Sequence, residues 1–130
     1  MKLLIADVQP LFHTAIRYLL RNTGLNLEFS SVYTAEQLFE TLSKQTVDLL
    51  ILDVCLNNFI GFRDVGYILN KYPNIRVLIF SNKATAVYAH LYLKLGAYGF
   101  IEKSSHESIF IEAVSQISYG RKYFTTEVFE

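Results

Sequence analysis

The chain has 130 residues, and its 12 lysines and arginines balance its 12 aspartates and glutamates. This length suits one domain with a real core and excludes two, and the balanced charge gives no overall positive field that would draw the protein directly to nucleic acid. The single cysteine, Cys55, excludes an internal disulfide and fits a reducing compartment. Because no apolar run approaches membrane-spanning length either, we expect a cytoplasmic protein that does not enter a membrane.

The first part of the chain alternates between strand and helix patterns. Residues 2–6 are mostly aliphatic and predict a buried strand, after which Pro10 suits the first turn of a helix, where its missing N–H is not needed. Residues 27–32 mix polar and apolar side chains, which is typical of an edge strand. Thr34 and Gln37 have the spacing of a capping box, so a second helix is predicted to begin there.

The alternation continues through the middle of the chain. Residues 49–52 are four consecutive aliphatics with no polar face, as in a parallel strand covered on both sides. Apolar spacing then predicts a third helix from residue 61 to about 72, a fourth strand at residues 75–80, and a fourth helix from about residue 84 to 95.

The last elements complete the pattern. Residues 98–101 predict a fifth strand, and Ser104 and Glu107 have capping-box form at the start of a last helix. Five short-linked alternations predict an α/β fold with a single parallel sheet, doubly wound, over residues 1–119. Residues 120–130 do not fit this scheme and read as a tail, in which residues 125–129 could open a longer element.

Polar residues follow four of the predicted strands: Asp7, Asp53, Ser81 and Lys103. If the first and third strands are neighbours, Asp7 and Asp53 lie close together, which is costly without a cation. Mg²⁺ suits such oxygen ligands, Lys103 supplies a fixed positive charge, and Ser81 supplies a hydroxyl. These groups are the parts needed to accept and hold a phosphoryl group, with Asp53 as the nucleophile.

Four segments of the sequence carry a family resemblance: IADVQPLF at residues 5–12, LILDV at 50–54, GFIEK at 99–103 and GRKYF at 120–124. In this order and spacing they resemble segments of the receiver domains of two-component response regulators, most of all the NarL/FixJ (LuxR-type) branch. The resemblance implies a flavodoxin-like, CheY-like fold with strand order 2-1-3-4-5. It also implies that the tail begins a linker to a DNA-binding output domain absent from this chain.

The same resemblance implies roles for the residues at the strand ends. Asp53 is similar to the aspartate that takes a phosphoryl group from a sensor histidine kinase. Asp7, Asp53 and the backbone carbonyl of Cys55 resemble the protein ligands of Mg²⁺, and Lys103 resembles the salt-bridging lysine. Such a domain accepts and slowly loses its phosphoryl group, and no other enzymatic activity is expected.

Two further residues resemble the family's switch. Ser81 is similar to the hydroxyl residue that swings toward the phosphoryl group, and Phe100 is similar to the aromatic residue that turns inward with it. The resemblance therefore implies a two-state equilibrium that phosphorylation shifts. DNA would be contacted only through the output domain.

The sequence departs from the family at Val8, where a second acid usually binds the ion directly. A carboxylate and a cation about 4 Å apart attract by about 4 kcal/mol at an effective dielectric of about 20. Val8 therefore predicts weaker Mg²⁺ binding, although Gln9 could reach the position as a neutral ligand. The alternative hypothesis is a phosphorylation-independent receiver that acts as a protein-interaction or dimerisation domain.

A third hypothesis is a phosphatase of the haloacid dehalogenase type, which also places an aspartate after a buried strand. That family needs a second aspartate two residues later, and this chain has Cys55 there. The position argues against a phosphatase.

The remaining candidate residues have simpler interpretations. The histidines of the sequence are far apart and lack metal-ligand spacing, so we expect them at the surface: His13, His90 and His106. Surplus apolar area could form a dimer face. The fourth predicted helix supplies both core and surplus apolar area through Tyr88, Leu91, Tyr92 and Leu95. Some of that surplus, or Tyr18 and Ile109 on the first and last helices, could form the face.

Overall fold

The computed structural model describes residues 1–124 and contains one parallel sheet of five strands in the order β2-β1-β3-β4-β5. The predicted fold class and strand order are confirmed. The strands are β1 (Lys2–Ala6), β2 (Glu28–Val32), β3 (Leu49–Leu52), β4 (Arg76–Ser81) and β5 (Gly99–Glu102).

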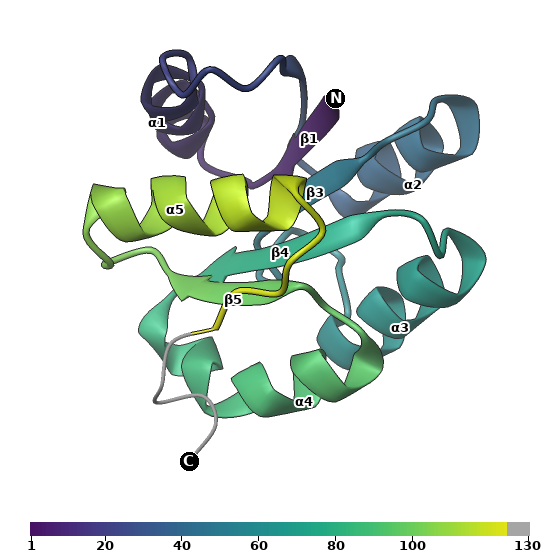
Figure 1. Cartoon of the computed structure of the whole chain (residues 1–130). Coiled ribbons are helices and arrows are strands. Elements are labelled where there is room, and N and C mark those ends of the chain that lie inside the picture. The colour runs from purple at the N-terminus through teal and green to yellow at the C-terminus, as the bar shows by residue number, and fades with distance from the viewer. Residues whose placement is uncertain (125–130) are drawn as a thin grey trace.

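Helices cover both faces of this sheet (Figure 1), with α1 and α5 on one face and α2, α3 and α4 on the other. Their bounds are α1 (Pro10–Leu20), α2 (Ala35–Lys44), α3 (Gly61–Lys71), α4 (Ala89–Leu95) and α5 (Glu107–Ser118), and a 3-10 helix, η1 (Lys83–Tyr88), precedes α4. Neighbouring side chains of a strand point to opposite faces, so Leu49 packs with α1 and α5 while Leu50 packs with α2, α3 and α4. A strand buried on both faces needs the unbroken aliphatic run found in β3.

The predicted fourth helix is divided, because residues 83–88 form η1 and only residues from Ala89 onward form α4. Packing of an apolar face supplies most of the stability of a protein helix. Val87 and Tyr88 are exposed, whereas Ala89 and Tyr92 are buried. The α-helix therefore starts where burial starts, and the prediction of one helix from residue 84 was wrong.

One predicted helix cap is confirmed and another was wrong. Thr34 Oγ1 accepts a hydrogen bond from the backbone N–H of Gln37 at 3.1 Å at the start of α2. The cap of α5 is His106, whose Nδ1 accepts from the backbone N–H of Ser108 at 3.1 Å. The predicted cap, Ser104, instead contacts Glu102.

The first residues of the predicted tail lie along the edge of the sheet. The backbone N–H of Tyr123 donates to the carbonyl of Tyr98 at 2.8 Å, and Tyr123 pairs with Gly99 in parallel. A side chain at Gly99 would meet the Tyr123 carbonyl, since a Cβ there would lie 2.8 Å from that oxygen. The element suggested for residues 125–129 lies outside the described residues.

Candidate functional site

The parallel register of the sheet brings the predicted site residues to one edge. Just past the strand ends, the backbone N–H of Asp53 donates to the carbonyl of Ala6 at 2.9 Å. In the same way, the N–H of Lys103 donates to the carbonyl of Ser81 at 2.8 Å. These bonds extend the pairing of β3 with β1 and of β5 with β4, so four side chains distant in sequence converge.

The convergence is close. The Lys103 ammonium Nζ lies 2.7 Å from Asp7 Oδ2 and 2.6 Å from Asp53 Oδ2. The other oxygen of Asp53, Oδ1, accepts from Ser81 Oγ at 2.7 Å and from the backbone N–H of Cys55 at 2.8 Å. Asp53 is therefore held by three donors, and both of its oxygens face the cluster.

Burial makes these contacts electrostatically strong, because little water screens them. Asp7 and Asp53 are buried, and the Lys103 side chain is only 11% exposed. Burial by itself lowers the pKa of Lys103, but its hydrogen bonds with Asp53 and Asp7 outweigh that effect and raise the pKa above the ordinary value. Lys103 is therefore a fixed cation at neutral pH, and it faces two carboxylates.

At Val8, where the family usually has a second acid, the site lacks a carboxylate. Val8 is 39% exposed, and its side chain offers no oxygen to a cation. Gln9 instead contributes polar groups: its backbone N–H donates to Asp7 Oδ1 at 2.8 Å, and its Oε1 accepts from Lys103 at 3.1 Å. Gln9 thus reaches the cluster through Lys103.

The two carboxylates form the donor set that a metal ion would use. Both are buried and aim an oxygen at one cationic position. Oxygen donors of this kind fit Mg²⁺, which keeps several of its waters and needs few protein ligands. Within residues 1–124 there is no group of three His, Cys, Asp or Glu side chains that could hold a metal. The residues present therefore fit a hydrated ion with two carboxylate ligands.

Phe100 and Cys55 are the other two residues to which the family resemblance assigns a role. Phe100 is buried in the core of the α4 side, and its ring lies 6.5 Å from that of Tyr92, which stacks at 4.6 Å on Phe62. The Cys55 side chain is exposed, with Sγ 3.6 Å from the Asn82 side-chain amide.

His13 is the site neighbour that the sequence analysis missed. It is buried, whereas His90 and His106 are exposed as predicted. The prediction of a surface position was wrong because His13 shares the buried face of α1 with Ile16 and Leu20. The spacing of these residues was the available signal.

Of the residues considered for a dimer face, some are exposed in the structure and one is buried. Tyr18, Tyr88, Leu91 and Leu95 are exposed, while Tyr92 is buried. Tyr92 therefore belongs to the hydrophobic core and cannot be part of a dimer face.

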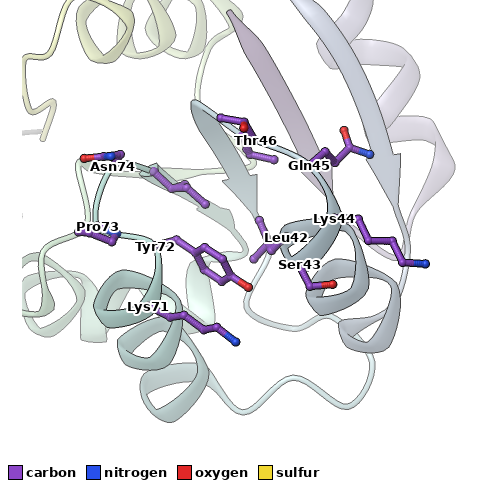
Figure 2. A pocket seen from close by; sticks show the side chains of 11 residues that line it. Leu42, Ser43, Lys44, Gln45, Thr46, Lys71, Tyr72, Pro73 and Asn74 are labelled. Atoms are coloured by element: carbon purple, nitrogen blue, oxygen red, sulfur yellow. The ribbon is translucent and has the colours of Figure 1, made fainter.

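A separate hollow of about 440 Å³ lies at the opposite end of the sheet, between the ends of α2 and α3 (Figure 2). Lys44 points away from the hollow in Figure 2, and both lysines that line it already have partners: Lys44 pairs with Glu40, and Lys71 donates to Tyr67. This hollow shares no lining residue with the Asp53 cluster.

Taken together, the fold and this cluster define a doubly wound α/β protein with two acids, a lysine and a serine at the carboxyl ends of its strands. Residues 3–115 match the family described as "Response regulator receiver domain". The chain belongs to this family, as its sequence motifs indicated. No helix within residues 1–124 has the length and apolar character needed to cross a membrane.

Several of the proteins similar to this chain are named as transcriptional activators or regulators. It is 28% identical over 127 residues to the Fimbriae Z protein of Escherichia coli (strain K12), covering 95% of this chain and 59% of that protein. It is 30% identical over 131 residues to the Glycerol metabolism activator of Pseudomonas putida, covering 98% and 58%. The chain thus spans less than two thirds of the length of these relatives.

Solved structures agree with this assignment. A LuxR family DNA-binding response regulator from Silicibacter pomeroyi superposes with a TM-score of 0.80 at 25% identity, with 96% of each chain covered. The isolated REC domain of RcsB from Salmonella enterica serovar Typhimurium gives a TM-score of 0.84 at 22% identity, covering 98% of this chain and 95% of that one. The second likeness supports the fold alone.

Proposed function

We propose that this chain is the phosphoacceptor domain of a two-component response regulator and that Asp53 takes a phosphoryl group from a sensor histidine kinase. The observation that carries the proposal is the contact set of Asp53, which meets Lys103, Ser81 and the Cys55 N–H within 2.6 to 2.8 Å. A buried carboxylate surrounded by hydrogen-bond donors is suited to carry a group whose negative charge must be stabilised from several sides.

In the transfer step, an oxygen of the Asp53 carboxylate attacks the phosphorus of a phosphohistidine. The O–P bond forms as the P–N bond breaks, and the bonding electron pair stays on the imidazole nitrogen of the donor. Lys103 then meets a phosphoryl oxygen in place of the carboxylate oxygen that it holds now, and Ser81 donates its hydroxyl hydrogen to a second one. Positioning and charge stabilisation supply the catalysis, because the residues form no other covalent bond.

Asp7, Asp53 and the backbone carbonyl of Cys55 would hold Mg²⁺ in this reaction. The ion, when bound, neutralises charge that develops on the transferring phosphoryl group. Because Val8 supplies no carboxylate, we expect affinity below that of a site with a third acid.

Ser81 and Phe100 would carry the signal away from Asp53. A phosphoryl group on Asp53 draws Ser81 and Lys103 toward itself and favours one arrangement of β5 and the helices beside it. The signal would pass to a DNA-binding output domain through the chain after α5, and the protein would act in the cytoplasm. RcsB, a structural neighbour, has been seen as dimers bound to DNA, which supports a dimeric form and DNA binding through that output domain.

Beryllofluoride with Mg²⁺ tests the proposal, because it forms an adduct that imitates a phosphoryl group on an aspartate. We expect a stable adduct with the wild-type chain and none with Asp53→Asn, measured by mass spectrometry and ¹⁹F NMR. Asp48→Asn is the matched control, since Asp48 precedes β3 at the other end of the same strand and accepts from the Lys2 N–H. Absence of an adduct in the wild type at millimolar Mg²⁺ would refute phosphoryl acceptance.

A second candidate is a receiver that works without phosphorylation. Three observations favour it: Lys103 already neutralises charge on both carboxylates, Ser81 already contacts Asp53, and Phe100 is already buried. These are the positions that the family resemblance associates with the switched state. Self-association that is the same for the wild type and Asp53→Asn, with no adduct in either, would support this candidate.

A further inference from the structure

We propose that His13 is a positioning residue for the site: it holds the backbone of Asp7 and so sets where the Asp7 carboxylate meets Lys103. His13 is 3% exposed and lies on α1, six residues after Asp7. The consequence for phosphoryl transfer rests on the function proposed above, whereas the positioning itself does not.

The hydrogen bonds of His13 define its role. Its Nε2 lies 2.7 Å from the Asp7 carbonyl oxygen, and its Nδ1 lies 2.8 Å from Ser31 Oγ. A carbonyl only accepts, so Nε2 carries the hydrogen and donates it to Asp7. Arg17 Nη2 also donates to Ser31 Oγ, at 2.8 Å. In the neutral imidazole with its hydrogen on Nε2, Nδ1 is an acceptor, and Ser31 Oγ, which accepts from Arg17, can donate its own hydrogen to it.

The Asp7 carbonyl needs this donor. Asp7 follows the last residue of β1, so its carbonyl lies beyond the strand pairing. Within residues 1–124 no backbone N–H donates to it outside the regular elements. The residue is buried, and a buried carbonyl without a partner is unfavourable. His13 supplies the partner from the adjacent helix.

With this bond, every polar group of Asp7 is held. Its N–H donates to the Val32 carbonyl at 3.2 Å, its Oδ1 accepts from Gln9, and its Oδ2 meets Lys103. The His13 ring in turn packs on the Tyr33 ring, with 4.3 Å between centroids. The carboxylate therefore takes its position from β2 and α1 as well as from its own strand.

Helix α1, which carries His13, also contacts Lys103. The Lys103 ammonium lies 4.2 Å from the centre of the Phe12 ring, which neighbours His13 on α1. A shift of α1 would move both partners of the Asp7–Lys103 ion pair. Residues that orient a metal ligand through its other hydrogen bonds commonly change metal affinity by about 10- to 100-fold when they are replaced.

Two substitutions separate positioning from core packing. His13→Phe keeps a ring against Tyr33 but cannot donate to Asp7, while His13→Gln keeps an amide N–H that can. His90→Phe is the control, because His90 is an exposed histidine on α4. The readouts are the amide hydrogen exchange of Gln9, whose N–H donates to Asp7 Oδ1, and the Mg²⁺ dissociation constant from NMR titration.

We expect His13→Phe to speed Gln9 exchange relative to the amides of β3 and to weaken Mg²⁺ binding by about tenfold. We expect His13→Gln to restore part of both effects and His90→Phe to change neither. If His13→Phe lowers stability but leaves Gln9 exchange and Mg²⁺ affinity at wild-type values, His13 is only a core residue and the proposal is wrong. Should His13→Phe fail to fold, Ser31→Ala, which removes the donor to Nδ1, is expected to shift the same readouts in the same direction, and no shift would overturn the proposal.

Failure of the proposed function gives a different result. A wild-type chain that forms no beryllofluoride adduct would refute phosphoryl acceptance, yet Gln9 exchange in His13→Phe would still decide whether His13 positions Asp7.

Discussion

The two ends of the sheet carry similar charged residues in opposite environments. At the carboxyl end, Lys103 is 11% exposed and lies between two buried acids. Beside the hollow at the other end, Lys44 pairs with Glu40 at 2.8 Å, yet the two side chains are 70% and 59% exposed. The distances are nearly equal, so the difference lies in the solvent: water screens the Lys44 pair and is largely absent from the Lys103 cluster. Similar ion pairs therefore have different energetic consequences.

The strongest way to test this contrast is to remove the cation from the buried end. Lys103→Met leaves Asp7 and Asp53 facing each other without a positive charge, and breaking a buried pair typically costs about 3–5 kcal/mol. We expect a loss of this size in the free energy of unfolding from urea denaturation at pH 7. A change no larger than that of Lys44→Met would contradict the difference between the two ends.

The difference in stability between the wild type and Lys103→Met should also depend on pH. The folded chain raises the pKa of Lys103 above its ordinary 10.5, because the hydrogen bonds with the two acids outweigh burial. A raised pKa means that the ammonium stabilises the fold fully below 10.5 and stops doing so as the pH rises through the folded pKa. The stability advantage of the wild type over Lys103→Met should therefore be constant from pH 7 to about 10 and shrink above 10.5. A constant advantage up to the alkaline limit of folding would rule out this ionic origin.

An added negative charge at the carboxyl end of the sheet should change the stability less than the loss of Lys103. Val8→Asp places a third acid near Asp7 and Asp53, and we expect it to lower the metal-free stability by about 1 kcal/mol through repulsion. The same acid should tighten Mg²⁺ binding by about tenfold or more, since it adds an oxygen ligand. Urea melts and Mg²⁺ titrations measure the two effects.

Val8→Asn is the control for that substitution, because it adds a polar group of similar size without the charge. We expect it to change Mg²⁺ affinity much less than Val8→Asp. If Val8→Asp is as stable as the wild type without metal, or more stable, then a carboxylate at position 8 is not repelled by Asp7 and Asp53 as we expect.

The smallest effect is expected at the exposed end. Lys44→Met removes the partner of Glu40, but solvent already screens that pair. The midpoint of urea denaturation should stay within error of the wild type at both low and high salt. A clear loss would mean that exposed pairs contribute to stability in this chain.

The local sequence was enough to predict much of the fold and the content of the site. The aliphatic run of residues 49–52 predicted a strand buried on both faces, and β3 is such a strand. The acids after β1 and β3, with Ser81 and Lys103, were found because strands that alternate with helices form a parallel sheet. Parallel strands end at the same edge, so the residues that follow them had to converge.

Other features depended on contacts that a local pattern does not contain. The α-helix α4 begins only at Ala89, which is buried, whereas Val87 and Tyr88 in η1 before it are exposed. His13 became a buried hydrogen-bond donor because Asp7 and Ser31 come from two other segments. Tyr123 joined the edge of the sheet because Gly99 leaves room for its carbonyl.

The amino-acid sequence by itself determined the order of the elements, the family, and which polar residues stand after the strands, since these follow from periodicity and motif spacing. The tertiary structure decided which charges are desolvated, that one lysine serves both acids, and that a histidine fixes the first of them. Such properties arise only when distant segments exclude water from one another, because burial determines both the strength of an ion pair and the need of a carbonyl for a donor.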